Sequence, residues 1–209
     1  MAICLSASAI HLYSQPDARA MNLYPWGGEY VVGNPESCVA LVTLSEEILL
    51  PREEIAIQGG MKTENLGVEK VVANVVSNPN IRFLILCGKE VRGHRSGDTL
   101  AALHRSGIDA NNRVVDAKGA VPYIENLTRE AVERFRQQIE LVDMTGERDK
   151  ERLLAKALEC AARNPGSFGE PFVAIKIEGK KKKADVSGML ALHSALRVDP
   201  YMETTELEG

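Results

Sequence analysis

A single histidine stands in a glycine-rich loop that directly follows an apolar run of the chain. The run at 81–87 leads into Gly88-Lys89-Glu90-Val91-Arg92-Gly93-His94-Arg95-Ser96-Gly97. Glycine lets a backbone approach a flat ligand closely, and a neutral imidazole coordinates metal ions. These residue types make His94 a candidate metal ligand, with Gly93, Ser96 and Gly97 as candidate binding residues beside it.

Strand-like segments precede and follow this loop. The apolar runs at 38–44 and 81–86 are typical of strands buried on both faces of a sheet. Shorter strands are expected at 29–32, 55–57, 114–115 and 172–177.

Helix-like segments alternate with these strands. Helical spacing of apolar residues, with polar caps, predicts four helices: one that starts at Thr63 or Asn65 and stops at Asn78, one at 97–105 capped by Ser96, one capped by Thr128 with a buried face reaching Val142, and one at 150–163.

The alternation favours an α/β fold, a Rossmann-like three-layer sandwich with a mainly parallel sheet. Open sheets of this kind bind ligands beyond the carboxyl ends of their strands, which is where the His94 loop falls. We expect residues 25–178 to form this domain, with an N-terminal extension at 1–24. Residues 179–209 are expected to form a polar C-terminal tail, in which one short helix is predicted at 189–196.

Composition and charge narrow the function classes. The chain has 209 residues, 44% of them hydrophobic, and a net charge of -4, so a basic nucleic-acid surface is not expected. Its cysteines, Cys4, Cys38, Cys87 and Cys160, form no C-x-x-C pair, which favours a reducing, cytoplasmic location. No stretch reaches the roughly 18 consecutive apolar residues of a membrane helix, so no transmembrane segment is expected.

The tetrapeptide His94-Arg95-Ser96-Gly97 matches half of a cofactor motif. It supplies the H-x-x-G part of the D-x-H-x-x-G signature of many cobalamin-binding proteins, but Arg92 stands where that signature has aspartate. The tetrapeptide alone is weak evidence, because a histidine in a glycine-rich loop is more often a surface or hydrogen-bonding residue.

Longer segments carry a more specific pattern. They are Lys62-Thr63-Glu64-Asn65-Leu66-Gly67, Ile81 through Gly88, Val91-Arg92-Gly93-His94, Ala102-Leu103-His104, Gly107-Ile108-Asp109, Ala117 through Asn126 and Glu133-Arg134-Phe135. Together they resemble the corrinoid-carrying A subunit of tetrahydromethanopterin S-methyltransferase. The resemblance covers about residues 26–145 and fades through residue 178.

The resemblance implies a cofactor and a reaction. In that family the A subunit holds a cobamide, and a histidine matching His94 is proposed as the lower axial ligand of cobalt. A corrinoid (cobalamin or cobamide) would carry a methyl group from methyl-tetrahydromethanopterin to coenzyme M. The hard chemistry would belong to the cofactor. The chain would then be a methyltransferase component with little activity alone, partnered by methyl-donor and methyl-acceptor subunits.

The resemblance also marks candidate walls of the cofactor site. Thr63, Asn65 and Leu66 precede a predicted helix whose N-terminus can bind phosphate or amide oxygens. Gly119, Pro122 and Tyr123 lie in a loop after a further predicted strand. Two alternatives stay open: Thr63 and Asn65 only cap the helix, or Tyr123 only packs.

One feature departs from the family. The complex-bound A subunit carries a C-terminal membrane helix, whereas this sequence ends in a polar tail, so we expect a soluble homologue that serves a different methyl donor or acceptor. A binding module of the same fold without corrinoid remains an alternative, although Gly93, His94 and Gly97 argue against it. A nucleotide-binding oxidoreductase ranks lower, because no G-x-G-x-x-G follows an early strand.

Overall fold

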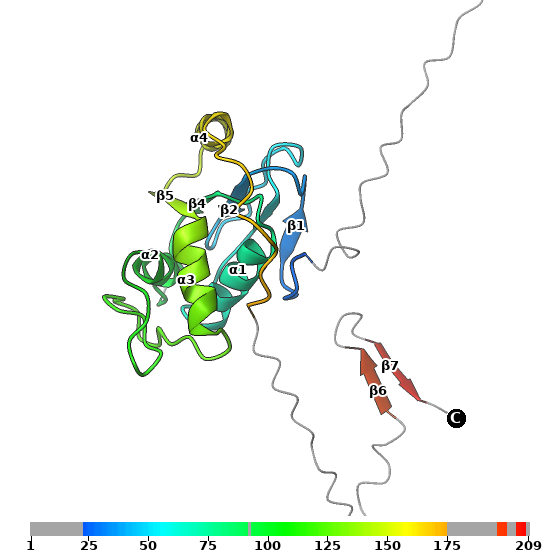
Figure 1. Cartoon of the computed structure of the whole chain (residues 1–209), viewed down its shortest axis with the longest axis vertical. Coiled ribbons are helices and arrows are strands. Elements are labelled where there is room, and N and C mark those ends of the chain that lie inside the picture. The colour runs from blue at the N-terminus through cyan, green and yellow to red at the C-terminus, as the bar shows by residue number, and fades with distance from the viewer. Residues whose placement is uncertain (1–22, 92, 175–195, 200–203, 208–209) are drawn as a thin grey trace, which may run out of the picture.

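A five-stranded sheet forms the centre of the molecule (Figure 1). The computed structural model describes residues 23–91, 93–174, 196–199 and 204–207. The strand order is β1-β3-β2-β4-β5; β1 pairs antiparallel with β3, and the other neighbours are parallel. The strands are β1 (Tyr30–Val32), β2 (Val39–Val42), β3 (Ile57–Gly59), β4 (Phe83–Gly88) and β5 (Glu140–Thr145).

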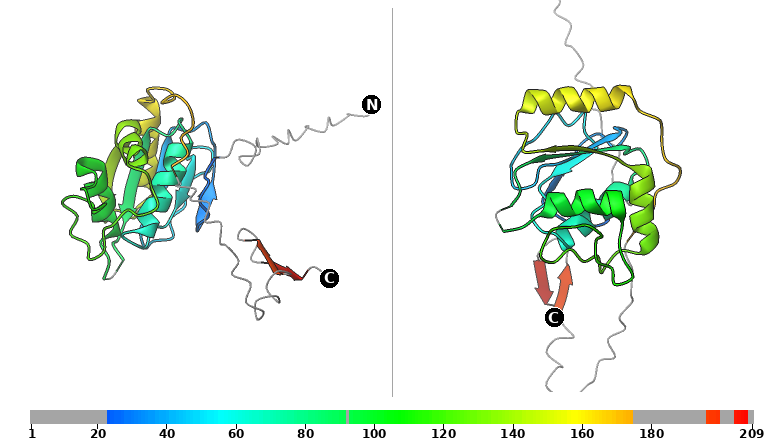
Figure 2. Two further views of the ribbon diagram at one scale, coloured as in Figure 1. Left: turned by 60° about the horizontal axis from the view of Figure 1, so that its bottom comes forward. Right: turned by 90° about the vertical axis from the view of Figure 1, so that its left-hand side faces the viewer.

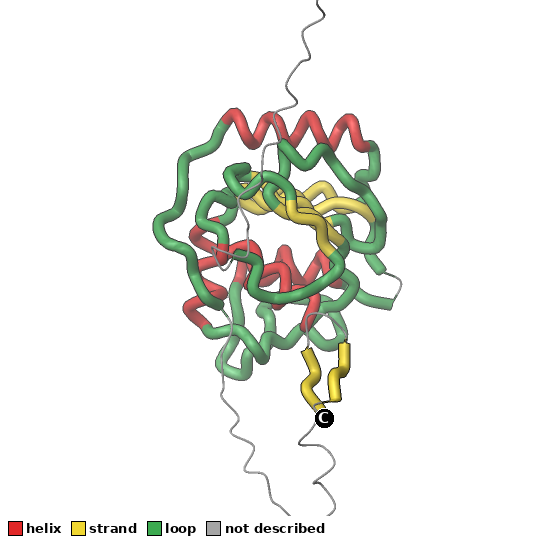
Figure 3. The backbone as a smooth tube through the Cα atoms, turned by 90° about the vertical axis from the view of Figure 1, so that its right-hand side faces the viewer, coloured by secondary structure: helices red, strands yellow, loops and turns green. Residues whose placement is uncertain are grey.

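Helices cover both faces of this sheet, as Figures 2 and 3 show. Three helices pack with the core on one face, and a fourth packs with a smaller core on the other. The first three are α1 (Leu66–Ser77), α2 (Ser96–Ser106) and α3 (Arg129–Gln138), and the fourth is α4 (Lys150–Ala162). The predicted three-layer α/β sandwich with a mainly parallel sheet is confirmed.

Strand β4 is apolar on both faces, so a helical layer has to cover each face of the sheet. All six of its residues are buried. Leu84 and Leu86 belong to the core under α1–α3, while Phe83 and Ile85 belong to the core under α4. Cys87 lies on the α4 side, and burial raises the pKa of its thiol to about 12, so it behaves as a small apolar side chain rather than a nucleophile.

Polar caps start two helices where the sequence predicts them. Asn65 accepts a hydrogen bond from the Leu66 N–H (2.7 Å), and Thr63 accepts one from the Gly67 N–H (2.7 Å). Thr128 caps α3 through the Ala131 N–H. The predicted Ser96 cap is wrong: Ser96 is the first residue of α2, and its buried hydroxyl donates to the carbonyl of Met61 (3.0 Å).

The largest correction concerns the segment after Thr128. The sequence predicts a helix with a buried face reaching Val142, but α3 ends at Gln138 and the chain becomes extended at Ile139. Residues 140–145 form β5, which pairs in parallel with β4 along its whole length. The open edge of β4 offers hydrogen-bond partners that a longer helix would leave unused.

Two short predicted strands are also wrong. Val114 makes only an isolated bridge with Ile108. Residues 172–174 have no regular structure; the Phe172 N–H donates to the Val76 carbonyl at the end of α1 instead of to a strand. Residues 175–177 lie outside the described part of the chain.

The described part of the tail contains a hairpin. Strands β6 (Leu196–Asp199) and β7 (Thr204–Leu207) pair antiparallel. Leu196 is therefore extended, while the rest of the helix expected at 189–196 lies outside the described residues. Among the described helices, none has the length and apolarity needed to cross a membrane.

A buried glutamine ties α3 to the turn between α1 and β4. Gln138 is 1% exposed, and its amide donates to the carbonyls of Asn78 (2.9 Å) and Ile81 (3.0 Å). Gln138→Ala should lower the free energy of unfolding by about 2–3 kcal/mol, because it removes two buried hydrogen bonds and leaves a cavity where the amide packs. Urea unfolding measures this, with Gln137→Ala at the neighbouring exposed position as the control. Equal losses for both variants would contradict the assigned role.

Candidate functional site

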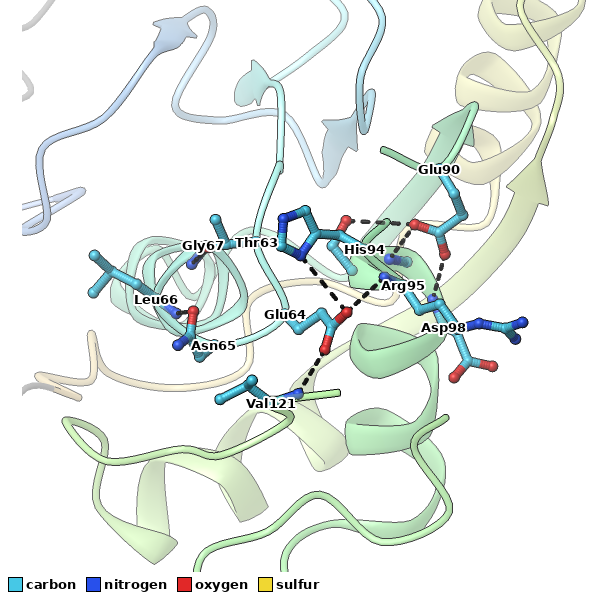
Figure 4. Close-up of polar contacts among 12 residues, drawn as sticks. Thr63, Glu64, Asn65, Leu66, Gly67, Glu90, His94, Arg95, Asp98 and Val121 are labelled. Atoms are coloured by element: carbon cyan, nitrogen blue, oxygen red, sulfur yellow. Dashed lines mark hydrogen bonds and ion pairs between the residues drawn. The ribbon is translucent and has the colours of Figure 1, made fainter. Parts of the chain in front are cut away.

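The loops that follow β3 and β4 meet beyond the carboxyl ends of the parallel strands, over the end of β2. Gly88 closes β4 with a positive φ of 78°, and a Cβ there would lie 2.3 Å from the Thr43 carbonyl oxygen. Only glycine allows this turn at such a close approach. The segment before α1 and the His94 loop are thereby brought side by side (Figure 4).

Glu90 caps helix α2 and shapes the His94 loop. Its carboxylate accepts hydrogen bonds from the N–H groups of Gly97 (3.1 Å) and Asp98 (2.9 Å). Negative charge is favourable at a helix N-terminus. A Cβ on Gly97 would lie 3.0 Å from this carboxylate and 3.2 Å from Leu44. Gly97 therefore serves close packing beneath the loop.

A second carboxylate, Glu64, lies between two loops. Its side chain is 4% exposed. One oxygen accepts from the Arg95 N–H (2.9 Å) and the other from the Val121 N–H (2.9 Å). Burial raises the pKa of Glu64, but the N–H groups of Val121 and Arg95 together with His94 outweigh burial and hold this pKa below its ordinary value. Glu64 is therefore a buried anion at neutral pH.

The imidazole of His94 faces this anion. Its Nδ1 lies 3.8 Å from the Glu64 carboxylate, and the side chain is 50% exposed. Figure 4 shows the ring turned so that its other nitrogen points away from Glu64. A carboxylate on one side of an imidazole helps to orient the ring, and here the opposite nitrogen faces away from the carboxylate.

The structure brings some predicted site residues together around His94. Thr63 lies beside the ring just before α1, whereas Asn65 and Leu66 lie farther away, with the Leu66 side chain directed away from the ring (Figure 4). Gly119 is buried against Glu64: a Cβ there would lie 2.3 Å from the carboxylate. At Gly93 a Cβ would meet nothing within 4 Å, so the space beside this part of the loop is open.

Other predicted site residues are used elsewhere. Ser96 and Gly97 are buried under the loop. Pro122 is buried, and its carbonyl accepts from the Val114 N–H (2.8 Å). Tyr123 is half-buried, with the Arg113 guanidinium 5.6 Å from its ring centroid. The contacts found for Tyr123 in the described residues thus connect it with the 108–124 loop rather than with His94.

Three site residues were not identified from the sequence. Glu64 and Glu90 hold the loop, and Val121 is an apolar side chain that is 53% exposed beside Glu64. The sequence gives only an indirect indication of Glu64. Arg92 stands where the D-x-H-x-x-G signature has aspartate, so a carboxylate that contacts His94 has to come from another segment.

Fold and site together define a class of protein: an α/β domain that presents one loop histidine, backed by a buried carboxylate, at the ligand-binding edge of its sheet. Comparisons with known proteins are more specific. The family model for MtrA, the A subunit of tetrahydromethanopterin S-methyltransferase, matches residues 19–185. The chain belongs to this family.

Three relatives named as A subunits of tetrahydromethanopterin S-methyltransferase agree with the family match. The one numbered 1 in Methanothermobacter thermautotrophicus is 47% identical over 174 residues, which cover 81% of this chain and 73% of the relative. The one numbered 2 in Methanobrevibacter ruminantium is 50% identical over 157 residues, covering 74% of this chain and 81% of the relative. The relative from Methanohalophilus mahii is 42% identical over 175 residues, covering 82% of this chain and 72% of the relative.

The buried anion predicts a pH-dependent stability. Glu64→Gln should cost about 1–3 kcal/mol at pH 7, because an amide offers one acceptor where two backbone N–H groups need one each. The folded-state pKa of Glu64 lies below the ordinary 4.5. The contribution of ionised Glu64 to the free energy of unfolding is therefore complete above pH 4.5 and disappears as the pH falls through the lowered pKa.

Urea unfolding from pH 7 to pH 3 tests this expectation, with Glu125→Gln as the exposed control. The gap between wild type and Glu64→Gln should narrow only at the acid end. A gap that is absent at pH 7, or that widens on acidification, would contradict the assignment.

Proposed function

We propose that this chain binds a corrinoid (cobalamin or another cobamide) and serves as the methyl-carrying component of a methyltransferase. His94 would be the lower axial ligand of cobalt. The observation that carries the proposal is the contact between Nδ1 of His94 and the buried Glu64 carboxylate, 3.8 Å long. It leaves the second ring nitrogen directed away from the protein support.

The residues around His94 fit such a ligand. The ring is half-exposed, so a large planar cofactor has access to it. Val121, beside Glu64, offers an apolar side chain that is 53% exposed, as suits the hydrocarbon edge of a macrocycle. The space at Gly93 is open. Among the described residues, no three His, Cys, Asp or Glu side chains gather to hold a bare metal ion.

In this proposal the protein binds the corrinoid and orients the residue that coordinates cobalt. When bound, the corrinoid supplies a cobalt centre that accepts and releases a methyl group. Glu64 would orient the His94 ring so that the opposite nitrogen faces the cofactor. The N–H groups of Arg95 and Val121 hold Glu64 in place. The His94 ring that contacts Glu64 is thereby held in a fixed orientation.

Methyl donor and acceptor follow from the family by name. The relatives are named as subunits of a tetrahydromethanopterin S-methyltransferase, so a methylated tetrahydromethanopterin is the proposed donor and a sulfur atom the proposed acceptor, in preference to the different donor or acceptor that the polar tail suggests; in the enzyme that the sequence resembles, the acceptor is coenzyme M. Separate partner subunits would activate them.

Replacing His94 tests the proposal. Purified protein is titrated with aquocobalamin, desalted, and its visible spectrum and cobalt content are measured. Wild type should retain about one corrinoid per chain, and His94→Ala should change the spectrum of the bound corrinoid because an axial nitrogen is lost.

His104→Gln is the matched control. Nε2 of His104 contacts the Ile139 carbonyl at 2.7 Å, and a glutamine amide can make the same contact. This variant should keep the wild-type spectrum. Failure of wild type to retain any corrinoid would favour a binding module that uses the same crevice for another ligand, and an unchanged spectrum in His94→Ala would remove His94 from the ligand role.

A further inference from the structure

A groove of about 1340 Å³ runs along the sheet between α1 and the edge strand β1. Its lining residues come from the segment that contains β1 and from α1. Its lining includes Thr63, Leu66 and Gly67 at the start of α1. Of these residues, Thr63 also lies beside the His94 ring (Figure 4). The groove is therefore continuous with the surroundings of His94, although His94 itself does not line it.

The lining combines aromatic rings with positive charge. Trp26 and Tyr30 contribute rings, and Lys62 and Lys70 contribute ammonium groups. Trp26 is held by its backbone: its N–H donates to the Asn74 side chain (2.9 Å), and its carbonyl accepts from that side chain (2.8 Å). This chemistry suits a ligand with a heterocyclic ring and an anionic phosphodiester.

An ion pair joins the two walls of the groove. Nζ of Lys62, just before α1, lies 2.8 Å from the Glu29 carboxylate, just before β1. Both side chains are largely exposed, 61% for Lys62 and 83% for Glu29. Exposed pairs of this kind are weak, so an incoming anion can displace Glu29 and take its place on Lys62.

We infer that this groove receives the nucleotide tail of the corrinoid, with Lys62 binding the phosphodiester in place of Glu29. The inference rests on the proposed function. Cobalt has one lower axial position, so a corrinoid ligated by His94 must place its own base elsewhere. The groove is the large cavity adjoining that position, and Glu29 sets the affinity by competing with the phosphodiester for Lys62.

Two corrinoids that share the ring system separate this claim from the proposed function. Cobalamin carries the nucleotide tail, and cobinamide lacks it. The full chain and its variants are titrated with each, and the dissociation constants are measured by calorimetry. Because every variant faces the same cost of releasing the cobalamin base, changes relative to wild type report on the groove alone.

Lys62→Ala should weaken cobalamin binding about five- to tenfold through loss of a charge-assisted hydrogen bond. Glu29→Gln should tighten it about two- to fivefold by freeing Lys62 and removing a like charge. Both variants should leave cobinamide binding unchanged. Lys150→Ala, at an exposed lysine that begins α4 on the other face of the sheet, should change neither.

Variants that alter both corrinoids equally, or neither, would overturn the groove assignment. If both corrinoids then still bind with a spectrum that depends on His94, the proposed function stands without it. Absence of binding by both corrinoids would overturn the proposed function and the inference together.

Discussion

The site depends on one buried carboxylate. Glu64 accepts backbone N–H groups from the loop after β4 and from the loop around residue 121, and its charge lies beside Nδ1 of His94. A buried anion is stable only when hydrogen bonds replace its water. The loops are thus held in the one arrangement that satisfies Glu64, and that arrangement aims the free nitrogen of His94 outward. Gly119 leaves the space that the carboxylate occupies.

The sheet makes this contact possible. Strands β3 and β4 lie on either side of β2 and run in the same direction, so the segments that follow them emerge at the same edge of the sheet. Two apolar layers anchor these strands from both faces, which gives the loop residues a rigid base. Glu90 adds local order by capping α2. Arg92 stands where the motif has aspartate, and the carboxylate that faces His94 comes from Glu64, about thirty residues earlier in the chain.

Local sequence patterns predicted the layers of the fold and placed His94 in the loop after β4, because apolar periodicity and helix caps depend on residues that are close in the sequence. Local patterns gave wrong or missing predictions where the structure of a segment depends on contacts with residues far away in the sequence. Ile139 and Val142 fit a helix face as well as a strand, and the open edge of β4 settles the matter in favour of β5. Ser96 has the right type for a cap, but Glu90 takes that role. Glu64 has no local signature at all, since its partners are the backbone of Arg95 and Val121.

The most direct test of the central claim is the electron paramagnetic resonance spectrum of the cobalt(II) form of cobalamin bound to protein labelled with ¹⁵N-histidine. An axial nitrogen splits each cobalt line through its nuclear spin, as a triplet for ¹⁴N and a doublet for ¹⁵N. The account predicts that labelling converts the triplet into a doublet, because the axial nitrogen belongs to the His94 ring held by Glu64. A triplet that survives labelling would place the cofactor's own base on cobalt, and a spectrum without nitrogen splitting would leave cobalt without an axial nitrogen; either result would contradict the account.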